Sequence, residues 1–174
     1  MTLLVVTALA SGCTKDTLVH LGPDGRPPPR IYRIAEDTES AVQFQMLDAI
    51  NSLRHAAYRE PMAFNSALNA AAATHSRDMA VQNRPWHFGS DGSSPLIRAK
   101  RSGYQGGFLG ETISETFETE LETLRAWMSR KDTRGVILDP RARHIGFSWY
   151  QELNGKIWWT LVTGTPKPPA PVHG

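Results

Sequence analysis

The chain has 174 residues, a length that suits one domain of ordinary size with additional segments at its ends. Apolar residues make up 40% and charged residues 21%, as in soluble globular proteins, which excludes a chain disordered throughout. The formal net charge is +2 and the basic residues form no stripe, so we expect no nucleic-acid partner. The densest basic segment, 98–101, is expected to be the solvated face of a helix.

An apolar run opens the chain and ends in small residues immediately before Cys13, the single cysteine. The run, MTLLVVTALASG, is too short to span a bilayer but suits the hydrophobic region of a signal peptide. Residues 10–13 resemble the lipobox of bacterial lipoproteins, with Ala10 where leucine is usual. No basic residue precedes the run, so we expect the true start to lie upstream. We predict a lipoprotein signal peptide over 1–12 and lipidation of Cys13, which would anchor the protein to a membrane. The alternative is an ordinary secretory signal with an incidental cysteine.

Two proline-rich segments flank the central part of the chain. Residues 13–38 show no helical or strand period and include GPDGRPPPR at 22–30, where consecutive prolines favour polyproline II. The tail 165–174, TPKPPAPVHG, has the same character and is expected to be disordered. We therefore predict a linker over 13–38, a single globular domain over 39–164 and a disordered tail.

Two helices are predicted in the first half of this domain. The first is indicated by apolar residues at spacings of three and four, namely Val42, Met46, Ile50, Leu53 and Ala57. Asn65 is a good N-cap for a second, alanine-rich helix that ends near Asn83.

Two further helices are predicted from their first residues. Ser94 stands before Pro95, which favours a short third helix running to Gly103. Thr119 and Glu122 form a possible capping box for a fourth helix. Four residues of that helix are expected to point inward: Leu121, Leu124, Trp127 and Met128.

Strand signals lie in two regions of the sequence. Residues 108–114 are short and suit an extended segment. Residues 144–151 and 157–163 are rich in aromatic and β-branched residues and flank Asn154-Gly155, which favours a tight hairpin turn with positive φ. Helices followed by a mixed region and an antiparallel pair predict an α+β layered domain.

Five segments, separated along the chain but in order, carry a resemblance to a known family. They are MLDAINSLRHAAYREPMAFNSALNAAAATHSRDMA at 46–80, HFGSDGSSPLIRAKRSGY at 87–104, GETI at 110–113, AWMSRKDTRGVILDP at 126–140 and IWWTLVTG at 157–164. The domain resembles bacterial members of the CAP superfamily, which includes cysteine-rich secretory proteins, antigen 5 and pathogenesis-related proteins. The resemblance implies a three-layer α/β/α sandwich.

The resemblance also implies a site. In many CAP proteins two histidines and two glutamates converge in a central cleft, and some members bind a divalent cation there. His87 matches the first histidine and Glu111 the glutamate of the Gly-Glu-Asn motif, so we expect these two side chains to be neighbours. The second acid is either Glu115 or Glu122. Imidazoles with carboxylates suit zinc or acid–base chemistry.

The second histidine of that pattern is missing. Thr133 stands before Arg134 where the family has histidine, and threonine is a poor zinc ligand. We therefore expect no stable metal and no other cofactor. His144, at the start of a strand, is the weak candidate to replace the lost imidazole beside His87.

Other residues favour structural interpretations. The alternative for His87 is a hydrogen bond to Glu111 that merely fixes its loop to the strand. His75, on the alanine-rich helix, is interpreted as structural or exposed, and Arg98 and Arg134 as salt-bridged scaffolding. Four tryptophans are expected to be core residues rather than a ligand platform: Trp127, Trp149, Trp158 and Trp159.

The leading functional hypothesis is a non-enzymatic lipoprotein, extracytoplasmic and lipid-anchored at the outer membrane or cell surface. It would bind a lipid, an envelope ligand or a partner through the central cleft, because the family has been linked to lipid or sterol binding and to cell-wall association. The alternative is a hydrolase of peptide or envelope polymer with Glu111 as base and His87 as its partner, which the absent second histidine disfavours. A third hypothesis is a degenerate domain kept as a surface interaction module. We expect a monomer.

Overall fold

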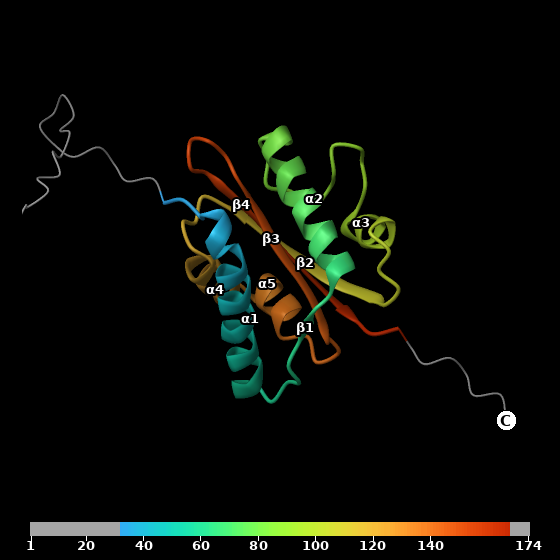
Figure 1. Ribbon diagram of the computed structural model, residues 1–174. Helices are drawn as coiled ribbons and strands as arrows, with labels where there is room; N and C mark the ends of the chain where they lie inside the picture. The colour runs from blue at the N-terminus through green and yellow to red at the C-terminus, as the bar shows by residue number, and fades with distance from the viewer. Residues whose placement is uncertain (1–31, 168–174) are drawn as a thin grey trace, which may run out of the picture. The chain divides into compact units, whose positions relative to one another are not determined.

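The structure is a computed structural model that describes residues 32–167. The predicted signal peptide 1–12, Cys13, most of the predicted linker and the end of the predicted tail lie outside the described residues. Within residues 32–167 five α-helices form (Figure 1): α1 (Glu39–Ala56), α2 (Ser66–Gln82), α3 (Pro95–Arg101), α4 (Glu120–Ser129) and α5 (Lys131–Ile137).

Side-chain caps begin three of these helices at the predicted residues. The side chains of Asn65, Ser94 and Thr119 each accept a hydrogen bond from the backbone N–H three residues later. Asn83 ends α2 in the left-handed conformation, with φ of 47°. The sequence signals for α2, α3 and α4 are therefore confirmed.

Four strands form one mixed sheet in the order β1-β3-β4-β2. They are β1 (Ala63–Phe64), β2 (Gly107–Glu115), β3 (His144–Gln151) and β4 (Ile157–Thr165). Strands β3 and β4 form the predicted antiparallel hairpin, β2 pairs antiparallel with β4, and β1 pairs parallel with β3. Gly155 in the hairpin loop has a φ of 97°, which explains why glycine stands there.

The helices cover both faces of the sheet and make three layers (Figure 1). On β4, Trp159 and Leu161 pack with α1, α4 and α5 in the larger hydrophobic core. Val162 points to the other face, where it packs with Leu68 of α2 and Ala99 of α3. The alternation along β4 follows the two-residue period of a strand. The domain is thus an α+β protein with the predicted α/β/α sandwich.

Several details differ from the sequence predictions. Leu121 is 38% exposed, because the buried face of α4 runs through Glu120, Thr123, Leu124 and Trp127 and is turned away from it. Strand β1 and helix α5 were not predicted. Of the tryptophans expected in the core, Trp149 is half-buried and the other three are buried.

The described fold begins before the predicted boundary at Glu39. The Arg33 guanidinium donates to the backbone oxygens of Glu152 (2.9 Å) and Leu153, and the Ile34 N–H donates to the Gln151 side chain at 3.1 Å. These bonds attach the segment to the β3–β4 hairpin. The domain accordingly includes residues 32–38. The sequence predicts a linker there because these residues show no helical or strand period. In the part of the chain that is described, no helix is long and apolar enough to cross a membrane.

Candidate functional site

A buried carboxylate on strand β2 lies at the centre of the site. Glu111 is paired in register with Val162, so its side chain faces the layer formed by α2 and α3. The side chain is 2% exposed. One oxygen, Oε1, accepts from Nδ1 of His87 at 2.8 Å, and the other, Oε2, accepts from Nη2 of Arg98 at 2.7 Å. The expectation that His87 and Glu111 are neighbours is confirmed.

Arg98, on α3, connects the carboxylate to the loop that carries His87. Its Nη1 donates to the backbone oxygens of His87 and Ser93, both at 2.9 Å, while Nη2 donates to Glu111. The side chain is 6% exposed. The expectation of a solvated face at 98–101 is therefore wrong for Arg98, because this guanidinium compensates a buried charge. The interpretation of Arg98 as salt-bridged scaffolding is confirmed.

A second histidine does join the cluster, from a position that the sequence reasoning did not assign to the site. His75 of α2 is fully buried, and its Nε2 donates to the Trp86 backbone oxygen at 3.0 Å. The same nitrogen lies 3.6 Å from Oε1 of Glu111. Burial lowers the pKa of His75, and the attraction of Glu111 opposes that effect. His75 is therefore a neutral, structural imidazole that braces the loop.

His87 is the accessible member of the cluster. Its side chain is 51% exposed, and it lies on the loop between α2 and α3. A carboxylate only accepts hydrogen bonds, so Nδ1 carries a proton toward Glu111, and in the neutral ring Nε2 is the acceptor nitrogen. The carboxylate thus fixes both the tautomer and the orientation of the ring.

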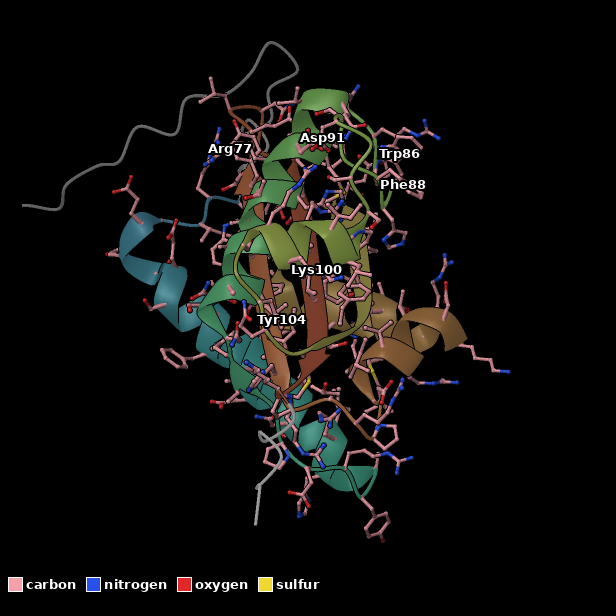
Figure 2. The ribbon with its side chains drawn as sticks, turned by 90° about the vertical axis from the view of Figure 1, so that its right-hand side faces the viewer. Arg77, Trp86, Phe88, Asp91, Lys100 and Tyr104 are labelled. Atoms are coloured by element: carbon pink, nitrogen blue, oxygen red, sulfur yellow. The ribbon has the colours of Figure 1, made fainter. Side chains whose placement is uncertain are left out.

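The His87 ring lines a cleft of about 400 Å³ between the loop, the edge of β2 and the helices α4 and α5. Its walls are mostly apolar or aromatic and include Pro85, Trp86, Ile113, Phe117, Ala126 and Trp127. Trp86 lies beside Phe88 of the same loop (Figure 2), with ring centroids 5.6 Å apart. Arg130, Asp132 and Thr133 supply the polar end of the cleft.

Thr133 is in the cleft, where the family has its second histidine. Its hydroxyl donates to the Trp127 backbone oxygen, so it serves the connection between α4 and α5. The neighbouring Arg134 donates to the Met128 backbone oxygen at 3.4 Å rather than to an acid. The threonine therefore supplies neither charge nor an imidazole to the cleft.

The other predicted candidates lie elsewhere. Glu115 forms an ion pair with Lys156, and Glu122 is an exposed residue of α4 that lines an adjoining hollow, which shares Phe117 and Ala126 with the cleft. His144 is hydrogen-bonded through Nδ1 to the hydroxyl of Tyr104 at 3.0 Å, and burial raises the pKa of Tyr104 to about 12. His144 is therefore hydrogen-bonded to Tyr104, and it does not line the cleft that contains His87.

The residues present do not suit the divalent cation found in some CAP proteins. Both oxygens of Glu111 are engaged, by His87 and by Arg98, and the guanidinium would repel a cation. Among residues 32–167 no three His, Cys, Asp or Glu side chains are grouped so that they could hold a metal ion. The remaining donor, Nε2 of His87, is a single ligand, whereas zinc sites use three or four.

Comparison with known families identifies the class of protein. The model of the cysteine-rich secretory protein family, CAP, matches residues 47–163, which is more than half of the chain. The chain therefore belongs to the CAP family. It is 28% identical over 130 residues to the uncharacterized protein YkwD of Bacillus subtilis (strain 168), and the match covers 75% of this chain and 50% of YkwD. The chain thus spans about half the length of that relative.

Solved structures share the fold at low sequence identity. An outer surface protein of Borrelia burgdorferi superimposes with a TM-score of 0.68 at 14% identity, covering 75% of this chain and 96% of that chain. An extracellular protein of Bacillus anthracis that contains an SCP domain gives the same TM-score at 19% identity, covering 77% of this chain and 45% of that chain. At these identities the likeness establishes the architecture alone.

Proposed function

We propose that this chain is an extracytoplasmic CAP protein that binds an amphipathic envelope ligand in the cleft without transforming it. The observation that carries the proposal is the half-exposed His87 ring, which a buried carboxylate orients inside a mainly apolar cleft. Nε2 of His87 accepts a hydrogen bond from a hydroxyl or another donor of the ligand. The apolar part of the ligand packs against Trp86 and Phe117.

The distribution of polar groups favours binding over chemistry. Glu111 is buried and paired on both oxygens, so it positions His87 and does not itself meet a ligand. Thr133 uses its hydroxyl on a backbone oxygen. A mainly apolar cleft with a few placed polar groups, of which His87 is held in a fixed orientation, is the arrangement typical of small-molecule binding sites.

We propose further that the protein works outside the cytoplasm and is attached to a membrane through lipidated Cys13. The support is the apolar run that precedes this cysteine, together with membership of a family described as secretory. Two structural neighbours are described as an outer surface protein and as an extracellular protein. Two or three acyl chains are enough for stable anchoring, at about 0.8 kcal/mol per buried methylene.

The ligand proposal is tested by titrating the full chain with a fluorescent fatty acid and measuring energy transfer from tryptophan, since Trp86 and Trp127 line the cleft. Ala126→Phe fills the cleft and should weaken binding at least tenfold. His87→Ala removes one hydrogen bond and should weaken it about three- to tenfold. Leu121→Phe is the matched control, because Leu121 lies on the same helix but outside the cleft. No binding by the unmodified protein, or equal affinity in all variants, would contradict the proposal.

One observation favours hydrolysis as a second candidate function. The Glu111–His87 pair is arranged like an imidazole base with an orienting acid, so His87 would be the base and Glu111 its positioning partner. This reverses the roles that the sequence suggested. Incubation with a peptidoglycan preparation, comparing the unmodified protein with His87→Ala, tests it: release of soluble fragments that depends on His87 would support hydrolysis.

A further inference from the structure

Strand β2 has one edge that no other strand covers. It is the last strand in the sheet order β1-β3-β4-β2, so within residues 32–167 only β4 pairs with it. The backbone groups of successive residues in a strand point alternately to its two edges. The Thr116 N–H donates to the Ile157 oxygen of β4 at 3.1 Å, so the even-numbered residues at this end of β2 also face β4. The backbone groups of Ile113 and Glu115 therefore point to the uncovered edge.

The contacts of Ile113 and Glu115 agree with this direction and leave their N–H groups available. The Ile113 oxygen accepts from the Trp127 indole N–H at 3.2 Å, and the Glu115 oxygen accepts from the Thr116 hydroxyl at 2.6 Å. Each of these oxygens has a second lone pair. Among the described residues no backbone oxygen outside the sheet accepts from the N–H of either residue. The edge thus offers donors and acceptors two residues apart, which is the pattern that a further strand requires.

A groove follows this edge. Ile113 and Ser114 line the cleft of about 400 Å³ that contains His87. The adjoining hollow, of about 460 Å³, is lined by residues 116–118 and by side chains of α4. Because the two hollows share Phe117 and Ala126, together they run along β2 and past its end. An extended chain rises about 3.3 Å per residue, so a peptide of about five residues matches the stretch 113–118.

The two parts of the groove differ in the side chains that line them. The cleft is mainly apolar and includes Trp86 and Phe117. The hollow contains Glu118 and Glu122 together with Arg125. The ion pairs found among the described residues include neither of these two acids. Two acids against one base leave a negative charge in the hollow, and such a charge favours a basic group in the ligand.

We propose that a short extended peptide of another protein adds to the edge of β2 in this groove. Apolar residues of the peptide lie in the cleft, and a basic residue lies beside Glu118 and Glu122. Strand addition takes its affinity from main-chain hydrogen bonds and its specificity from the pockets for alternate side chains. The inference rests on the proposed function, because it names the class of ligand that the same cleft binds. A peptide N–H is also a donor from which Nε2 of His87 can accept.

The test uses the full chain labelled with ¹⁵N and the peptide acetyl-Val-Thr-Val-Thr-Val-Lys-amide, followed by NMR. A saturable shift is expected, and hydrogen exchange at the amides of Ile113 and Glu115 should slow by about tenfold or more in the complex. Thr112 and Ser114 are the internal controls, because their N–H groups already face β4, and their exchange should change by less than about twofold. The same peptide methylated at every backbone nitrogen should bind about tenfold more weakly or worse, since it has no N–H to donate.

The position of the basic residue is tested by reversing a charge in the hollow. Glu122→Lys should weaken binding of the lysine peptide about three- to tenfold. Glu39→Lys is the matched control, because it makes the same change of charge at an exposed residue of α1 outside the groove, and it should leave the Kd within about twofold. Equal affinities of the two variants would contradict the assignment of the basic residue to the hollow.

The outcomes separate this inference from the proposed function. Binding of the fatty acid without binding of the peptide would overturn the inference and leave the proposed function standing, whereas failure of both ligands to bind would overturn both. Peptide binding without slower exchange at Ile113 and Glu115 would exclude strand addition. Slower exchange at these two amides when the protein alone is concentrated would assign the edge to a second copy of the chain, which would also overturn the inference.

Discussion

A single buried carboxylate arranges the nitrogen-bearing side chains of this site. Glu111 holds His87 through one oxygen and Arg98 through the other, and His75 lies 3.6 Å from the first oxygen. Each partner has a different role because its exposure differs. Arg98 balances the charge, His75 braces the loop from inside, and His87 presents its second nitrogen to the cleft.

The burial of His75 predicts an acid-sensitive fold. Its pKa is lowered in the folded state, whereas the unfolded chain has the ordinary value of about 6.5. The unfolded state therefore binds the proton first, and stability present above about pH 6.5 is lost as the pH falls through that value toward the lower folded-state pKa.

Urea unfolding at pH 7.5 and pH 5 should show this loss in the unmodified protein. The His75→Gln variant should show a smaller difference in unfolding free energy between the two pH values. The reduction is up to about 1.4 kcal/mol for each pH unit below about 6.5. His55→Gln is the matched control, because His55 is an exposed histidine of α1, and it should keep the full difference. An unchanged difference in His75→Gln would show that another group is responsible.

The close packing of helix α2 on strand β3 positions the site. A Cβ added at Gly146 would lie 2.2 Å from the backbone of Leu68, so glycine is required where the helix crosses the strand. The Asn69 side chain accepts from the Phe147 N–H at 2.9 Å, next to this crossing. The approach sets the depth at which α2 places His75 behind Glu111.

Gly146→Ala should therefore lower the free energy of unfolding by about 1–3 kcal/mol or more, as overpacked cores do. Gly135→Ala is the counterpart, since a Cβ at Gly135 meets nothing within 4 Å and the residue lies inside α5. That change should raise the free energy by about 0.5–1 kcal/mol. Thermal or urea unfolding of the two variants gives the comparison, and equal stabilities would contradict the packing argument.

Elements with a local chemical signal could be predicted from the sequence, and those that depend on tertiary contacts could not. Asn65, Ser94 and Thr119 cap their helices through bonds three residues away, so their patterns are visible in the chain. Helix α5 has seven residues and no side-chain cap, and the two residues of β1 are a strand because they pair with β3.

The same distinction applies to the site. Glu111 and His87 could be predicted as site residues from a family motif. The sequence also shows threonine at position 133, where the family has its second histidine. The sequence pattern could have identified His75 as a buried residue, because it shares the buried face of α2 with Leu68, Ala72 and Met79 at helical spacing. Its proximity to Glu111 depends on the crossing of α2 over the sheet, which the sequence pattern does not encode.

The CAP domain occupies the larger part of the chain, and the proposed anchor precedes it in the sequence. Cys13 should carry the lipid. Expression in a bacterium with a fatty-acid probe, comparing the unmodified chain with Cys13→Ala, should give label in the first and none in the second. Equal labelling of both proteins would exclude this attachment site, while the cleft proposal would stand.

We propose that the cleft presents one oriented imidazole to a ligand and is not a metal centre. Calorimetric titration with zinc at neutral pH tests this most directly, using the unmodified protein, Thr133→His, and Thr133→His combined with His87→Ala. We expect no tight binding by the unmodified protein and an affinity at least tenfold higher in Thr133→His. The double variant should lose that gain, because His87 and residue 133 line the same cleft. Tight stoichiometric zinc binding by the unmodified protein would instead show that the cleft is a metal centre.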